Sequence, residues 1–204
     1  MIPSLTGYQN EKRAVSMPGK TRSPFAYQQL ENASYVTIDA NLAPKVEEVR
    51  VDMADMKVEN GSVELLTSVG SCVAICLHDS VHKCGGLAHV MLPHSSDVSH
   101  EPLPSKYADT AIPALVEGIR KMCGKDLRLS AKIAGGANMF ANLGSDGNLD
   151  IGGKNVRAAR EGLSNRKIRL IGEDVGGLHG RRISFNVSSG VMMVKSFNGE
   201  NKKL

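Results

Sequence analysis

Short apolar segments follow one another along most of this chain, and only two segments have the length and spacing of helices. The segments with strand character are residues 49–53, 63–69, 73–77, 87–92, 127–133, 168–171, 183–187 and 191–194. In the first of them apolar and polar residues alternate, which is typical of a half-buried strand. Residues 188–190 read Ser-Ser-Gly and predict a hairpin between the last two segments. A chain with this many short strands is built around β-sheets.

Two helical segments interrupt the strands. Residues 107–123 carry a stripe of apolar side chains at helical spacing, namely Ala108, Ile112, Leu115, Val116, Ile119 and Met122. Residues 155–165 repeat this spacing with Val156, Ala159 and Leu163. Strands, a helix, a strand, a helix and further strands do not form the regular alternation of a parallel α/β sheet. The order therefore predicts an α+β fold with mixed sheets.

Residues 1–44 differ from the rest of the chain. They contain Pro3, Pro18, Pro24 and Pro44 and many Ser, Asn and Gln residues, and they show no sustained hydrophobic period. Such a segment buries too little apolar surface to fold on its own. We expect a poorly structured N-terminal arm over residues 1–44 and a single folded domain over residues 45–204.

Composition and charge exclude several functional classes. The net charge of +4 is spread along the sequence, and no run of Lys or Arg indicates binding to nucleic acid or to a membrane surface. The apolar stretches are far shorter than a membrane span, and the first ten residues lack the charged start and apolar block of a secretory signal. We therefore expect a cytoplasmic protein without direct membrane insertion, in which the four cysteines are reduced.

Cys72 and His89 are the candidate catalytic pair. Cys72 follows Gly70 and Ser71 directly after an apolar segment, and His89 lies seventeen residues later in another. A free thiol has a pKa near ~8.5, so a neighbouring imidazole increases its reactivity at neutral pH and can later protonate a departing amine. Gly70 permits a tight turn that leaves a backbone N–H free to face an oxyanion. The spacing alone does not specify a pair, because a cysteine in an apolar strand is most often a small core residue.

A zinc site is the alternative use of these residue types. Six cysteines and histidines fall within eighteen residues: Cys72, Cys76, His78, His82, Cys84 and His89. There is no C-x-x-C pair, however, and Cys72, Cys76 and His78 lie along one expected strand instead of surrounding a point. We expect Cys76 to be a core residue, and His78, His82 and Cys84 to lie on an exposed hairpin. No metal or organic cofactor is expected.

Two glycine pairs could suggest phosphate-binding loops. They are Gly135-Gly136 and Gly176-Gly177. Neither is followed by Lys-Ser/Thr, and neither has the G-x-G-x-x-G spacing. Close packing of the backbone near the candidate site is the better interpretation.

Over residues 46–204 the chain resembles the CheD family, the chemoreceptor glutamine deamidases of bacterial and archaeal chemotaxis. Seven blocks in matching order carry the resemblance: GSCVA at 70–74, AHVMLP at 88–93, KYADTA at 106–111, KIAGGANMF at 132–140, IGGKNV at 151–156, DVGG at 174–177 and GRR at 180–182. Any one block is a weak signal, but seven with matching spacing are highly specific.

The resemblance implies a three-layer α/β/β sandwich, similar to the catalytic domain of deamidating toxins. It also implies hydrolysis of receptor glutamine side chains to glutamate, with release of ammonia. The family nucleophile falls on Cys72 and the family base on His89. The third catalytic residue of the family is a threonine on the strand before the cysteine. Thr67 is the candidate, although it precedes Cys72 by five residues and the family spacing of six falls on Leu66.

The family also implies two kinds of protein partner, the chemoreceptors and a CheC-type phosphatase that tunes deamidation. The alternative function is therefore a regulatory binding partner of such a phosphatase with little turnover. The presence of both Cys72 and His89 favours an enzyme.

Overall fold

The described residues of the computed structural model, 46–95, 103–138 and 150–204, form two five-stranded sheets and two α-helices. Sheet A has the strand order β1-β3-β8-β9-β10, and sheet B has the order β2-β5-β4-β6-β7. Both sheets are mixed, because β1–β3 and β6–β7 are parallel pairs and the other pairs are antiparallel. The N-terminal arm expected at residues 1–44 lies outside the described residues.

Sheet A consists of β1 (Glu47–Arg50), β3 (Val63–Val69), β8 (Arg181–Asn186), β9 (Met192–Ser196) and β10 (Asn201–Lys203). Sheet B consists of β2 (Met56–Asn60), β4 (Val73–Asp79), β5 (Cys84–Val90), β6 (Leu129–Gly135) and β7 (Arg169–Val175). The helices are α1 (Ala108–Cys123) and α2 (Ile151–Asn165), and a short 3-10 turn, η3 (Pro104–Lys106), precedes α1.

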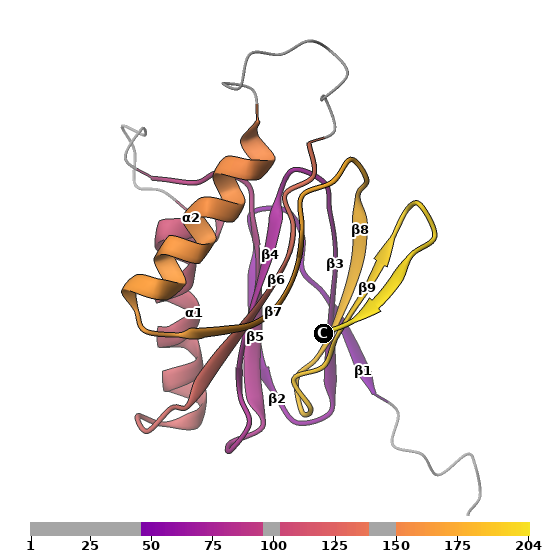
Figure 1. Ribbon diagram of the computed structural model, residues 1–204. Coiled ribbons are helices and arrows are strands. Elements are labelled where there is room, and N and C mark those ends of the chain that lie inside the picture. The colour runs from indigo at the N-terminus through magenta and orange to yellow at the C-terminus, as the bar shows by residue number, and fades with distance from the viewer. Residues whose placement is uncertain (1–45, 96–102, 139–149) are drawn as a thin grey trace, which may run out of the picture. The chain divides into compact units, whose positions relative to one another are not determined.

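Both helices cover the outer face of sheet B, and sheet A covers its other face (Figure 1). Every residue of β4 and β5 is therefore buried. Along β4, Val73, Ile75 and Leu77 belong to the core shared with the helices, whereas Ala74 and Cys76 belong to the core between the sheets. This alternation is the period of two that a strand imposes. The layers confirm the three-layer α/β/β sandwich and the α+β class.

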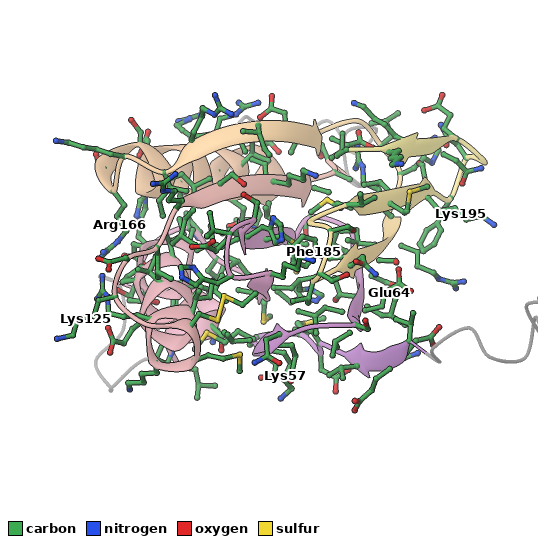
Figure 2. The ribbon with its side chains drawn as sticks, turned by 90° about the horizontal axis from the view of Figure 1, so that it is seen from below. Lys57, Glu64, Lys125, Arg166, Phe185 and Lys195 are labelled. Atoms are coloured by element: carbon green, nitrogen blue, oxygen red, sulfur yellow. A yellow bond between two sulfur atoms is a disulfide. The ribbon has the colours of Figure 1, made fainter. Side chains whose placement is uncertain are left out.

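The core between the two sheets is built around Phe185 of β8, which is fully buried (Figure 2). Its neighbours on sheet B are small, because Ala74 and Cys76 lie on the facing side of β4. A Cβ added at Gly85 of β5 would lie 3.3 Å from the Phe185 ring. Small residues on one sheet thus make room for the one large aromatic of the other.

Two details of the sequence prediction are wrong. The strand expected at residues 49–53 ends at Arg50, because Ala54 takes a positive φ of 59° and turns the chain toward β2. His78 and Cys84 are buried instead of exposed, since sheet A covers the face of β4 that carries His78 and α1 covers the start of β5.

The expectation of four reduced cysteines is also wrong. Cys84 at the start of β5 and Cys123 at the end of α1 form a disulfide, visible beside α1 in Figure 2. Because α1 packs along β5, the start of β5 and the end of α1 lie next to each other although 39 residues separate the two cysteines in sequence.

Among the described residues, no group of three or more His, Cys, Asp or Glu side chains is arranged to hold a metal ion.

Neither α1 nor α2 is long and apolar enough to cross a membrane.

Candidate active site

Cys72 and His89 lie on the same face of sheet B. His89 on β5 is directly opposite Ala74 on β4, so both side chains point into the layer between the sheets. Cys72 precedes Ala74 by two residues and packs against the same core. The thiol is thus the diagonal neighbour of the imidazole, a relation that sets Cβ atoms about 7 Å apart and within reach of an aromatic ring.

Thr67 approaches His89 from the opposite sheet. Its Oγ1 lies 2.8 Å from His89 Nδ1 and also 2.8 Å from the carbonyl oxygen of Val51. A carbonyl can only accept, so the single hydroxyl proton of Thr67 is donated to Val51. The hydroxyl must then accept a proton from His89, which places the imidazole hydrogen on Nδ1. Nε2 is left as the basic nitrogen, and it has no hydrogen-bond partner among the described residues.

The position of Thr67 on its strand explains why it, and not Leu66, meets the histidine. The inward-facing residues of β3 are the odd-numbered ones, and Thr67 is buried at 6% exposure. Leu66 points to the other side of sheet A. Of these two neighbouring residues, Thr67 is therefore the one whose side chain faces His89.

Glycines let the end of β6 pack directly on the Cys72 loop. The N–H of Gly136 donates to the carbonyl of Cys72, and that of Ala137 donates to Gly70, both at 2.8 Å. Gly135 has a φ of +119°, and a Cβ there would collide with the Cys72 carbonyl oxygen. The expected close backbone packing at Gly135-Gly136 is confirmed.

Burial shifts the pKa values of both Cys72 and His89. Burial raises the pKa of the Cys72 thiol above its ordinary value, and the backbone N–H of Cys72 opposes this shift. Burial lowers the pKa of His89 below 6.5, with Asp52 acting in the opposite direction. Burial therefore favours the neutral thiol and the neutral imidazole over their charged forms.

A pocket of about 530 Å³ lies beside the histidine. It is lined by His89 and Thr67 together with Arg50, Val51, Asp52, Met53, Leu66, Ser68, Arg182 and Ser184. Apart from His89, the lining comes from sheet A and from the turn after β1, and it mixes polar and apolar residues. The volume lies within the range of ligand pockets, about 300–1,000 Å³.

Sequence reasoning missed two parts of this site. The Val51 carbonyl fixes the proton of Thr67, but a backbone group leaves no sequence signal. Asn155 of α2 is fully buried and donates to the carbonyls of Ser71 and Met91. Its membership of the IGGKNV block at 151–156 is the one sequence signal that could have found it.

The chain is similar in sequence to known proteins. The profile of the family described as CheD chemotactic sensory transduction matches residues 91–196. A probable chemoreceptor glutamine deamidase CheD of Desulforamulus reducens is 41% identical over 150 residues, which are 73% of this chain and 90% of the relative. The chemoreceptor glutamine deamidase CheD of Thermotoga maritima is 43% identical over 142 residues, covering 70% and 87%.

A third relative, a probable chemoreceptor glutamine deamidase CheD of Clostridium botulinum, is 40% identical over 152 residues, covering 74% of this chain and 94% of its own. The three alignments span nearly the whole length of each relative. By this similarity, the chain belongs to the CheD family.

Proposed function

We propose that this protein hydrolyses glutamine side chains of chemoreceptors to glutamate and ammonia by a cysteine–histidine mechanism. The supporting observation is the placement of Cys72 and His89 as diagonal neighbours on one face, with the basic Nε2 of the imidazole unpaired. The names of the relatives supply the substrate class. Thr67 is the proposed orienting residue, because its hydroxyl fixes the tautomer of His89.

The first half of the reaction forms a thioester. His89 Nε2 takes the proton of the Cys72 thiol as the sulfur attacks the side-chain carbonyl carbon of glutamine. The carbonyl oxygen becomes an oxyanion, which the backbone N–H of Cys72 is proposed to bind. The tetrahedral adduct then collapses, its C–N bond breaks, and the protonated His89 gives its proton to the leaving ammonia.

The second half regenerates the thiol. His89, neutral again, takes a proton from water while the water oxygen attacks the thioester carbon. The C–S bond breaks, the sulfur recovers the proton from His89, and glutamate leaves. Each proton that enters the cycle is accounted for by Nε2, so the steps require no cofactor. A cytoplasmic location and pairing with a CheC-type phosphatase are part of the same proposal.

The direct test uses a purified chemoreceptor cytoplasmic fragment as substrate. Peptide mass spectrometry after incubation with the wild-type protein should show specific glutamines converted to glutamate, with ammonia released in equal amount. Cys72→Ala should leave the receptor unchanged. Ammonia release that persists at the wild-type rate in Cys72→Ala would reject the mechanism, and binding of receptor without any conversion by wild type would favour the regulatory alternative.

A further inference from the structure

Asn155 stands out among the buried polar side chains that the proposed chemistry does not use. It lies in the second turn of α2 and is completely buried. Asparagine is a poor helix former, and a buried amide is costly unless its hydrogen bonds are made. A residue of this type at this position therefore needs a structural reason.

The side-chain amide of Asn155 joins the two strand ends that carry the candidate pair. Nδ2 donates to the carbonyl oxygen of Ser71 at 3.0 Å and to that of Met91 at 2.8 Å. Ser71 directly precedes Cys72, and Met91 follows His89 by two residues. The reversed amide would place Oδ1 against two carbonyl oxygens, so the orientation of the group is fixed.

Glycines bring α2 close enough for this contact. A Cβ at Gly152 would lie 2.5 Å from the Gly136 carbonyl oxygen, and a Cβ at Gly136 would collide with Val156. The first turns of α2 thus rest on the backbone of Gly136, whose own N–H holds the Cys72 carbonyl. Three consecutive carbonyls of the loop therefore accept hydrogen bonds. Those of Gly70 and Cys72 accept from backbone N–H groups at the end of β6, and that of Ser71 accepts from Asn155.

The geometry of the Ser71–Cys72 peptide group determines where the Cys72 N–H points. The Ser71 carbonyl and the Cys72 N–H belong to one peptide group, and in a trans peptide they point in opposite directions. The carbonyl points to Asn155 in the helix layer, so the N–H points toward the layer between the sheets. The sulfur of Cys72 and the ring of His89 lie in that layer.

We infer that Asn155 is a positioning residue that turns the Ser71–Cys72 peptide so that the Cys72 N–H faces the oxyanion of the reaction. The same contact to Met91 holds the strand of His89 in register with the Cys72 loop. This inference deepens the proposed function and rests on it for the identity of the reaction. The same N–H also acts on the thiol, because it opposes the rise in the pKa of Cys72 that burial causes.

The test compares Asn155→Leu, which keeps a similar volume but cannot donate, with Leu163→Ala on the same helix. Leu163 is buried in the core beneath α2 and serves as the control for loss of stability alone. Asn155→Leu should lower kcat on receptor by about 10–100-fold with KM changed less than about threefold, because a misdirected oxyanion donor acts in the transition state. Leu163→Ala should leave kcat within about twofold although it unfolds more readily.

A second readout does not depend on deamidation. The rate of Cys72 alkylation by iodoacetamide, measured against pH by peptide mapping, should have a higher midpoint in Asn155→Leu than in wild type, because the N–H no longer faces the sulfur. Leu163→Ala should keep the wild-type midpoint. If no receptor is deamidated by wild type, the proposed function fails, and the alkylation midpoints still decide the role of Asn155.

The inference is overturned if Asn155→Leu keeps both the wild-type kcat and the wild-type alkylation midpoint, or if Leu163→Ala shifts both equally. Should Asn155→Leu fail to fold, Asn155→Asp replaces it. A protonated carboxyl can donate to one of the two carbonyls, whereas a carboxylate can donate to neither. The activity of Asn155→Asp relative to wild type should then fall as pH rises, and a constant ratio near one would overturn the inference.

Discussion

Two cysteine–histidine pairs lie on the same face of sheet B, and their cysteines differ in access to solvent whereas both histidines are buried. Cys72 and His89 lie near one end of that face, and Cys76 and His78 lie further along β4. Cys72 is partly exposed and His89 lines a pocket, whereas Cys76 is 1% exposed. The residue types are the same, so composition of the pair does not decide which one can react.

The second pair is enclosed by sheet A. The His78 ring packs against Phe185 in an edge-to-face arrangement with the ring centroids 6.3 Å apart. Burial raises the pKa of Cys76 well above its ordinary value, against the opposing charge of Lys132. Burial lowers the pKa of both histidines. A shifted pKa therefore marks burial in both pairs, and it is the partial exposure of the Cys72 thiol that separates the candidate site from the core.

The largest expected contrast is between the two thiols. Cys72→Ser should reduce deamidation by a thousandfold or more, on the order of other losses of a nucleophile. Cys76→Ala should keep kcat within about threefold and lower only stability, by about 1 kcal/mol. Initial rates of ammonia release and urea denaturation measure the two effects. Equal losses of kcat in both variants would remove the distinction between the pairs.

The two histidines should differ nearly as much. His89→Gln removes the proposed general base and should lower kcat by about 10²–10⁴-fold. His78→Gln replaces a ring that only packs in the core, so its kcat per folded molecule should remain near wild type. Stopped assays with the folded fraction measured by circular dichroism separate turnover from folding. A turnover defect in His78→Gln as large as that in His89→Gln would contradict the assignment.

Thr67→Val tests the orienting contact at a smaller scale. Valine keeps the shape of threonine but cannot hold Nδ1 of His89, so a fraction of the imidazole takes the wrong tautomer or turns away. We expect kcat to fall by about 10–100-fold, the usual cost of losing a supporting contact. Thr110→Val is the matched control, because the Thr110 hydroxyl only binds carbonyls at the start of α1. Wild-type kcat in Thr67→Val would exclude an orienting role.

The disulfide should affect stability but not turnover. Reduction of Cys84–Cys123, or Cys123→Ser, releases a loop closed over 39 residues and should lower the free energy of unfolding by about 2–4 kcal/mol. The loss of kcat should be less than about twofold, because neither cysteine lies in the layer of Cys72. Thiol titration of the native protein and denaturation with and without reductant check this. Four free thiols in the native protein would contradict the bond.

The smallest expected effect is a loss of folding stability at acidic pH, and here the two histidines should behave alike. Both histidines have a folded pKa below the ordinary 6.5, so the unfolded chain takes up protons at a higher pH than the folded one. Their contribution to stability is complete above pH 6.5 and is lost as pH falls through the lowered folded pKa. His78→Gln and His89→Gln should each reduce this loss in chemical denaturation between pH 7 and 5. An unchanged pH slope in both variants would contradict the burial of the rings.

Much of the fold could be predicted because buried strands and helices carry a clear hydrophobic period. β2 was missed because Met56 and Val58 are only half-buried and the segment is short. β10 (Asn201–Lys203) is exposed and polar, and it exists because its backbone pairs with β9. The disulfide depends on how α1 lies along β5, a tertiary relation that sequence spacing does not contain.

The candidate site was predicted in its residue types but not in its supporting contacts. Cys72 and His89 lie in sequence blocks of the family, and the strand register then brings them to one face. Thr67 was placed by its type, and the inward side of β3 explains its position. Asn155 contacts only backbone carbonyls of the site, so its place in the block at 151–156 marks the residue but does not reveal these partners.

The most direct measurement is selective alkylation of the native protein with iodoacetamide, followed by peptide mapping and assay of the same samples. We expect Cys72 to be modified while Cys76 remains protected, and deamidation to be lost in proportion to the Cys72 label. Modification of Cys76 at a similar rate, or full turnover by protein labelled at Cys72, would contradict it.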